Sequence, residues 1–260
     1  MTYPDGEKVT YDYNSSMLLE KLFNDQGTPL EPADDYLYAS STEYDAAGRV
    51  RTRALGNGLT QGFDYYAWDE KATVDSVLTG QGGRLKILSA GTLQNLGYLY
   101  DAAGNLRTIE DSTTTPNHEI QAFGYDALNR LESATVTNGP APYSEGYTYD
   151  PSTGNLQTKS GLTYTYSTAH PHAVSTFNGN MYDYDANGNM TVRQIAGGPL
   201  AGDYSLGYDA ESRLVSVTGP NGFAASFAYN GDGQRVQSTI AGVTTTFVGN
   251  HYEVTVGAAT

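Results

Sequence analysis

Aromatic and polar positions alternate along much of the chain, and short polar segments interrupt the alternation at intervals. In five copies of the motif described next, Phe or Tyr stands two residues before the motif Tyr, which puts both rings on one face of an extended strand. β-branched or alternating segments, such as LESATVT from Leu131, follow the interruptions and predict return strands. The pattern predicts an all-β chain of consecutive antiparallel hairpins, with about 16 to 19 strands of roughly 6 to 8 residues each. The paired rings are Tyr98/Tyr100, Phe123/Tyr125, Tyr147/Tyr149, Tyr182/Tyr184 and Phe227/Tyr229.

The interruptions share a motif: Tyr-Asp (once Tyr-Asn), then Gly or a small polar residue, then a polar residue that is usually Asn or Arg, then an aliphatic residue. The Asp carboxylate can accept a hydrogen bond from the backbone two residues on, and Gly supplies the positive φ that closes a short hairpin. Asn129 is the next-best residue for that conformation and Ser212 a poorer one, so we expect the turn after Tyr208 to differ in type. We assign a structural role to these motif residues: Tyr44, Asp45, Gly48, Tyr100, Asp101, Gly104, Tyr125, Asp126, Asn129, Tyr149, Asp150, Gly154, Tyr184, Asp185, Gly188, Tyr208, Asp209, Ser212, Tyr229, Asn230 and Gly233.

The motif tyrosines are 56, 25, 24, 35, 24 and 21 residues apart, which indicates a repeat array. We predict one array over residues 1–260, with a degraded first repeat in 1–40 and the remaining repeats in 41–256. A strand in LTYTY, from Leu162, falls within the 35-residue interval.

The 56-residue interval predicts one repeat with an enlarged turn. A strand ending near Trp68 and a return strand beginning near Gly82 would enclose it. The enlarged turn, about residues 69–81, is expected to be a loop or a short helical turn. Insertions of this kind often form a variable binding surface, although a plain extended loop is the simpler alternative.

Composition narrows the classes of function. The chain has 22 Tyr, 30 Gly and no Cys, which excludes a disulfide scaffold, a thiolate metal site and a cysteine nucleophile. A net charge of −15 argues against binding to nucleic acid or anionic lipid. No apolar run approaches the roughly 20 residues of a membrane helix, so no membrane insertion is expected. The first residues lack the basic and apolar regions of a secretory signal.

Candidate chemistry is sparse. His170 and His172 could donate to a metal, but a third ligand is not nearby in sequence, and Pro171 favours a surface turn. The segment from Asp185 resembles the start of an EF-hand loop, yet its Gly188 is at the wrong position. No nucleotide-binding glycine motif or nucleophile elbow occurs. We therefore expect no catalytic residue, no metal and no cofactor.

The repeated Tyr-Asp signature resembles the YD repeats of the Rhs family, which includes bacterial polymorphic toxins, the shell-forming component of insecticidal toxin complexes, and teneurins. The resemblance runs from about Tyr11 to Val256. It implies a long, curved sheet of β-hairpins that spirals into a hollow shell, of which this chain would form part. In toxin members the shell encloses a cytotoxic domain. The Rhs core and its autoproteolysis site are not recognisable here, and the end of the chain resembles the repeats just before that core.

The leading expectation is a non-catalytic shell segment that encapsulates or displays other protein, secreted by or on the surface of a bacterium. Its expected partners are further repeats of the same polypeptide or another copy, met through open strand edges, and an enclosed toxin domain. The alternative is a carbohydrate-binding or adhesive module that uses exposed Tyr and the Asp/Asn turns. A polysaccharide hydrolase is the third candidate, and it requires two carboxylates in one cleft.

Overall fold

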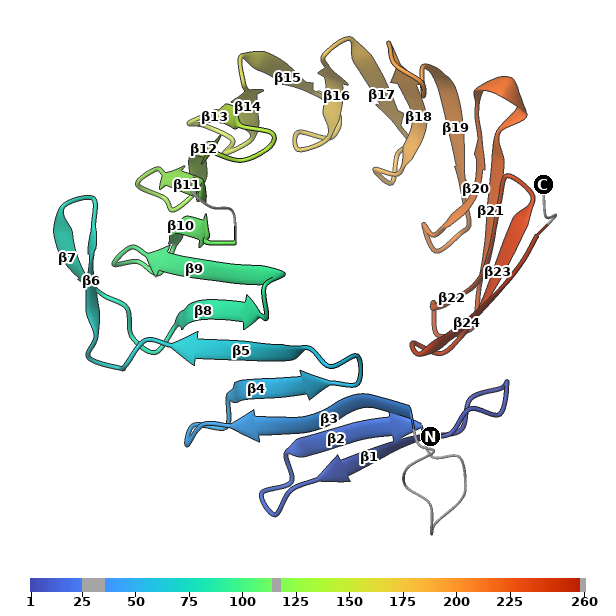
Figure 1. Cartoon of the computed structure of the whole chain (residues 1–260). Coiled ribbons are helices and arrows are strands. Elements are labelled where there is room, and N and C mark those ends of the chain that lie inside the picture. The colour runs from blue at the N-terminus through green and yellow to red at the C-terminus, as the bar shows by residue number, and fades with distance from the viewer. Residues whose placement is uncertain (25–35, 114–117, 258–260) are drawn as a thin grey trace. The chain divides into compact units, whose positions relative to one another are not determined.

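The computed structural model describes residues 1–24, 36–113 and 118–257. These residues form 24 β-strands and one 3-10 turn, Pro220–Gly222 (Figure 1). Every strand pairing is antiparallel and joins strands that are neighbours along the chain, apart from one insertion in the first unit. The prediction of an all-β chain of consecutive antiparallel hairpins is confirmed. The chain divides into two compact units, residues 1–146 and 147–260.

In the first unit, the strands pair in chain order, except that β5 pairs directly with β8. The intervening β6 and β7 form a separate two-stranded sheet. Residues 25–35 of the expected first repeat lie outside the described residues. The strands are β1 Val9–Tyr13, β2 Leu19–Asn24, β3 Tyr36–Tyr44, β4 Val50–Leu55, β5 Thr60–Tyr65, β6 Lys71–Val74, β7 Val77–Gly80, β8 Leu85–Ala90, β9 Gln94–Tyr100, β10 Leu106–Asp111, β11 Glu119–Tyr125 and β12 Leu131–Thr137, followed by the first half of β13 Tyr143–Tyr149.

In the second unit, the end of β13 pairs with β14, and the pairing continues in chain order to β24. No strand in the described part of this unit is skipped. The strands are β14 Leu156–Lys159, β15 Leu162–Tyr166, β16 Val174–Phe177, β17 Asn180–Tyr184, β18 Met190–Ile195, β19 Gly202–Tyr208, β20 Leu214–Thr218, β21 Ala224–Tyr229, β22 Arg235–Ile240, β23 Val243–Val248 and β24 Tyr252–Val256.

The expected number of strands, 16 to 19, is wrong. The described residues contain more because several strands are only four residues long, among them β14 and β16. Short strands allow the interval between Tyr149 and Tyr184 to hold an additional complete hairpin, β15–β16. The inserted β6–β7 hairpin adds two more strands.

The register of the hairpins contains a repeated irregularity. Tyr44 is opposite Val50 and Glu43 is opposite Thr52, so one residue of the return strand, Arg51, is extra. The same β-bulge occurs beside Tyr125, Tyr184, Tyr208 and the other hairpin tyrosines. A β-bulge increases the local right-handed twist of the strands. The motif therefore fixes a twist at the same point of each hairpin.

Burial is sparse, as expected for a single layer of strands. The fully buried apolar residues are mostly small, such as Ala39, Ala90 and Ala134, with few larger side chains such as Tyr66. Large apolar side chains remain exposed in both units, for example Leu128 and Leu200. Within the strands most residues are half-buried, so neighbouring strands and their side-chain ladders supply much of the packing.

The expectation that the enlarged turn is a loop or a short helical turn is wrong. It is the β6–β7 hairpin (Figure 1). Its tip residues Asp75 and Ser76 both have positive φ, as a two-residue hairpin turn requires. Asp75 Oδ2 is 2.7 Å from Arg107 Nη2, which links the tip to β10. The predicted strands on either side are confirmed, because β5 and β8 pair over Gln61–Tyr65. The predicted strand around Leu162 is confirmed as β15.

Candidate functional site: the tyrosine–aspartate turns

Five of the six motif aspartates hold their turns with both carboxylate oxygens. Asp45 Oδ1 accepts hydrogen bonds from the backbone amides of Ala47 and Arg49, both at 2.9 Å. Asp45 Oδ2 accepts a hydrogen bond from Arg49 Nε at 2.7 Å. The Asp45 amide donates to the Arg49 carbonyl at 2.9 Å and closes the turn. The same arrangement recurs at Asp126, Asp185 and Asp209.

The geometry explains why the motif accepts either Arg or Asn four residues after Asp. Arg130 and Arg213 donate through Nε at 2.7 Å, and Asn105 and Asn189 donate through Nδ2 at 2.9 Å, each to Oδ2 of its own Asp. Both residue types place one N–H at the same oxygen. The Tyr-Asn copy uses a different pair, since Asn230 Nδ2 donates to the Gln234 side chain at 3.4 Å.

The hydrogen bonds lower the pKa of the motif carboxyls. The backbone amide four residues on is the largest cause at Asp45, Asp126 and Asp209. At Asp185 the Asn189 side chain is the largest cause. The turn at Asp150 is one residue longer, and there the Ser152 hydroxyl, with the amides of residues 152 and 153, lowers the pKa to about 2. These carboxylates are ionised and engaged at neutral pH, which does not suit a general acid.

The residue three positions after the motif Asp or Asn, or four positions after Asp150, has positive φ in every copy. It is Gly at 48, 104, 154, 188 and 233, with φ between 76° and 94°. Asn129 and Ser212 adopt φ of 58° and 61° in the same place. The expectation that the Ser212 turn differs in type is wrong: its amide donates to the Asp209 carbonyl at 3.0 Å, as Gly48 does to Asp45. The Ser212 hydroxyl accepts a hydrogen bond from Asn189 Nδ2 at 3.2 Å, which offsets the conformational cost.

Six hairpin tyrosines in the described residues donate a hydrogen bond to the hairpin before their own. Tyr125 Oη donates to the carbonyl of Leu106 at 3.0 Å, and Leu106 is the aliphatic motif residue of the preceding hairpin. Burial raises the pKa of Tyr125, so the hydroxyl remains protonated and able to donate. The equivalent bonds run from Tyr44 to Leu19 at 2.5 Å, Tyr65 to Val50 at 3.0 Å, Tyr166 to Leu156 at 2.6 Å, Tyr184 to Val174 at 2.8 Å and Tyr229 to Leu214 at 2.8 Å.

Three further copies of this hairpin have another residue in place of Asp, and sequence reasoning missed only the one at Tyr166. Tyr13 is followed by Asn14, whose Oδ1 accepts from the amides of Ser16 and Leu18 at 2.9 and 3.1 Å. Tyr65 is followed by Tyr66, and Tyr166 by Ser167. The sequence predicts the first as a degraded repeat and the second as a repeat with an enlarged turn. The usable signal was the alternation of aromatic residues before each position, such as Phe63 and Tyr65, together with an aliphatic residue after the turn.

The two histidines lie in the turn that follows Tyr166, as predicted, and each contacts a different neighbouring turn. His170 Nε2 is 2.9 Å from the Asp185 carbonyl oxygen, and His172 Nδ1 is 2.6 Å from Asn155 Oδ1. Within the described residues, no group of three or more His, Asp or Glu side chains is placed to hold a metal ion. The pair therefore links three successive turns.

Adjacent turns also contact each other through the residue four positions after Asp. The Arg49 guanidinium lies 4.0 Å from the ring centre of Tyr65 in the next hairpin, and that of Arg213 lies 5.1 Å from the ring centre of Tyr229. Asn105 instead donates to Asn129 Oδ1 in the next turn at 2.8 Å. The turns thus form a continuous row of side-chain contacts along one edge of the strands within each unit.

A model of the RHS repeat family matches residues 100–141 and 208–246, which contain four of the hairpins with this geometry in whole or in part. The chain contains RHS repeats. Among curated proteins, this RHS-repeat chain is similar to the tRNA nuclease WapA of Bacillus subtilis, with 31% identity over 215 residues, 80% of this chain and 8% of the relative. It is also similar to the double-stranded DNA deaminase toxin A of Burkholderia cenocepacia, with 27% identity over 130 residues, 50% of this chain and 9% of the relative.

Solved structures share the fold of the RHS-repeat chain. A Tc holotoxin pore of Photorhabdus luminescens matches 99% of this chain and 14% of its own, with a TM-score of 0.73 and 20% identity. A crystal structure of TcdB2-TccC3-Cdc42 matches 98% of this chain and 14% of its own, with a TM-score of 0.69 and 20% identity. The RHS-repeat chain thus spans less than a tenth of the length of those curated relatives and about a seventh of those solved chains.

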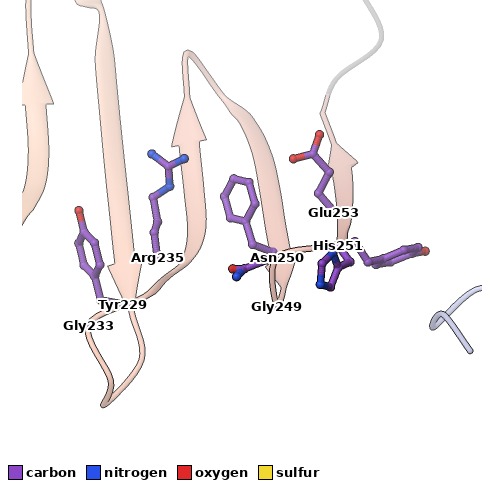
Figure 2. Close-up of a pocket in the computed structure, with 9 residues that line it drawn as sticks. Tyr229, Gly233, Arg235, Gly249, Asn250, His251 and Glu253 are labelled. Carbon is purple, nitrogen blue, oxygen red and sulfur yellow. The ribbon is translucent and has the colours of Figure 1, made fainter. Parts of the chain in front are cut away.

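Two further observations describe the surface of the RHS-repeat chain. No helix in the described residues is long and apolar enough to cross a membrane. A pocket of about 690 Å³ opens between the ends of β21 to β24, and Figure 2 shows Tyr229, Arg235 and Glu253 along it. The Arg235 guanidinium is 4.9 Å from the ring centre of Phe247. This pocket combines aromatic rings with charged and amide side chains.

Proposed function

We propose that the chain is a segment of a repeat-built shell or surface scaffold that encloses or displays other protein. The observation that carries this proposal is the hydrogen bond from the hairpin tyrosine to the preceding hairpin, as between Tyr125 and Leu106. It adds a side-chain link to the backbone pairing, so successive hairpins stabilise each other as neighbours in a repeat array do. The sparse burial of large apolar side chains suits a single layer that surrounds something, better than a packed globule.

The repeated β-bulge supports a curved array. A wide sheet whose strands twist in one sense accumulates that twist and curls. In the proposed arrangement residues 1–260 form one array that spirals as part of a hollow shell. Its terminal strands pair with further repeats of the same polypeptide or another copy. The named nuclease and deaminase toxins among the relatives suggest a toxin domain as the enclosed cargo, in a bacterial protein that is secreted or displayed at the cell surface.

The proposed role is not catalytic. The carboxylates of the six motif aspartates accept hydrogen bonds within their own turns, as those of Asp45 and Asp126 do. An acid/base pair would require at least one carboxyl with a raised pKa. Within the described residues, every carboxyl with a resolved shift in pKa has it lowered, for example Asp111 and Glu70.

Electron microscopy of the full polypeptide that carries this chain tests the proposal. We expect a hollow particle with a curved sheet as its wall, and a cargo segment that resists protease until the wall is opened by denaturant. A solid particle without a curved sheet would contradict the shell. If the cargo segment is cleaved as fast in the intact particle as after denaturation, the particle does not enclose it. The proposal would then be restricted to a scaffold that displays other protein.

The pocket at β21 to β24 favours carbohydrate binding as a second candidate. Tyr229, Phe247 and Tyr252 supply ring faces, and Asn250 and Glu253 supply hydrogen-bonding groups. Such a combination of apolar surface and a few polar groups is typical of small-ligand sites. A glycan array followed by titration of any hit tests it, with Glu253→Gln as the variant and Glu211→Gln, in the turn after β19, as the matched control. Loss of binding in the first variant alone is expected. An array without hits would exclude this candidate.

A further inference from the structure

A second depression, of about 530 Å³, lies on one face of β18 to β22 in the second unit. Its floor is apolar and includes Leu206, Val217 and Phe227. Register places Leu206 opposite Val217 and Val217 opposite Ala225, so these side chains share one face of the sheet. The volume falls within the roughly 300 to 1,000 Å³ of small-molecule sites.

Two connections form the wall of this groove and are fixed to each other. Tyr204 Oη donates to the carbonyl of Leu200 at 3.1 Å, and the Tyr204 ring meets the Phe223 ring edge to face with centres 6.1 Å apart. A Cβ at Gly219 would lie 2.6 Å from the Tyr204 ring, and one at Gly202 would lie 2.7 Å from Pro220. The wall is therefore close-packed, and the groove is formed without a ligand.

Charge distinguishes the groove from the rest of the surface. Arg193 is the only charged residue among those that line it, in a chain whose net charge is −15. Arg193 is opposite Tyr204 in the register, which places it on the groove face of β18. Leu200 and Ile240 line the groove although 62% and 46% of each residue is exposed. An apolar floor beside a single cation is complementary to an apolar molecule with one negative end.

The backbone of the groove argues against an extended peptide as the occupant. Each of β18 to β22 is paired on both sides, so its inter-strand amides and carbonyls are already used. A peptide on this face would bury amide groups without partners, which costs free energy. A hydrocarbon chain has no such groups.

We propose that this groove binds a linear apolar carboxylate of the size of a medium-chain fatty acid, with its carboxylate at Arg193 and its chain along Leu206, Val217 and Phe227. The assignment is independent of the shell proposal, because an array of hairpins can form with the groove empty. The site would give this segment a ligand of its own on the face that also carries the rings of Tyr182 and Tyr204.

Dodecanoate below its micelle concentration tests the proposal by calorimetry and by NMR of the methyl groups. We expect saturable binding with shifts confined to the groove methyls, such as those of Leu206, Val217 and Ile240. Leu200→Ser and Arg193→Gln should each weaken binding about fivefold, from lost apolar contact and lost charge respectively. Leu128→Ser, at an exposed leucine in the turn after β11, should leave it unchanged.

Comparison with neutral dodecanol and cationic dodecyltrimethylammonium tests whether the negative charge of the ligand is recognised. Both should bind more weakly than dodecanoate to the unaltered chain, and the difference should disappear in Arg193→Gln. Equal binding of all three would overturn the carboxylate assignment. Shifts spread over both units, no saturation, or binding of an apolar peptide without binding of dodecanoate would overturn the site itself. Because Leu200 and Arg193 are exposed, both variants should keep their fold, and unchanged circular dichroism verifies it.

Discussion

The turn from β3 to β4 and the connection from β5 to β8 each join two paired antiparallel strands, but they do so with different residues. Both follow a tyrosine, Tyr44 or Tyr65, that donates to the preceding hairpin. In the first, Asp45 holds a tight turn through its carboxylate. In the second, Tyr66 takes the place of Asp, and a whole hairpin is accommodated before the return strand begins. The bond between hairpins and the bulged register are common to both, so the turn itself is the exchangeable part.

The longer connection is anchored by a neutral, buried side chain. Gln81 has no exposed surface, its Nε2 donates to the Tyr100 carbonyl at 2.9 Å, and its Oε1 accepts from the Tyr100 amide at 3.1 Å. Tyr66 Oη donates to the Tyr98 carbonyl at 2.8 Å. Where the standard turn uses an ionised group at the surface, this one uses an amide in the interior. The two should therefore respond differently to pH and to substitution.

Lowering the pH should destabilise the aspartate turns but not the connection from β5 to β8. We expect this to be the largest effect on stability, because several carboxylates are protonated together. The motif aspartates have folded pKa values below the roughly 3.9 of an unfolded chain, about 2 for Asp150. Groups with a depressed pKa stabilise the fold above the unfolded value, and this contribution is lost as pH falls through the folded value. We expect stability to decline between about pH 4 and pH 2. Amide protection followed by NMR should fall first at Arg49, Arg130 and Arg213.

Two connections provide internal controls for the acid experiment. The turn at Asn230 has no carboxylate at the motif position, and the Gln81 contacts are neutral. Protection at Gln234 and at Tyr100 should therefore persist over the pH range in which the aspartate turns weaken. A uniform loss at all turns would mean that the carboxylates do not determine the acid response.

Gln81→Met should produce the largest effect of a single substitution. It keeps the side-chain volume but leaves the Tyr100 amide and carbonyl without their partner in the interior. Each unsatisfied group costs about 1 to 3 kcal/mol, so we expect a loss of about 3 kcal/mol in the free energy of unfolding of the first unit. Urea denaturation measures it. Gln121→Met, which alters a half-buried glutamine on β11, is the matched control and should change little. Equal effects would show that Gln81 is not an anchor.

How far the sequence predicted the molecule depends on whether a feature is local. The turns at Asp45 and Asp126 could be predicted because the Asp, the Gly or Asn, and the return strand lie within a few residues. The hairpin at Ser167 could not, because its turn has a different length and residue, and only its position beside Tyr184 restores the pattern. The groove could not be predicted for the same reason, since Arg193 and Phe227 are brought to one face through three successive strand pairings.

Tyr184→Phe tests the feature that both kinds of turn share. The substitution removes only the hydroxyl that donates to the Val174 carbonyl at 2.8 Å. We expect a loss of about 1 kcal/mol, the usual net value of a hydrogen bond. Tyr182→Phe, two residues earlier on the same face, is the control, and its hydroxyl has no hydrogen bond within the described residues. If both variants lose the same free energy of unfolding, the hydrogen bond between hairpins contributes nothing. The two kinds of turn would then share only the bulged register of their strands.

The smallest effect should come from exchanging one way of linking adjacent turns for another. After Asn189, the next turn carries a side chain, Ser212, that accepts its second N–H. After Arg84, the next turn has Gly104, and a Cβ there would lie only 3.1 Å from the guanidinium. Asn129, which follows Asn105, obeys the same rule. The departures from Gly at this position therefore follow from the residue in the preceding turn.

The double substitution Asn189→Arg with Ser212→Gly converts one type of link into the other. Ser212→Gly alone loses the hydrogen bond, and Asn189→Arg alone crowds a guanidinium against the Ser212 side chain. Together they should reproduce the pair of Arg84 and Gly104, so a double-mutant cycle should give a favourable coupling of about 0.5 to 1 kcal/mol, near the lower end for residues in contact. Thermal unfolding of the four proteins measures it. Additive effects would mean that each turn is independent, and the pairing of Asn with Asn129 or Ser212 would then have no energetic cause.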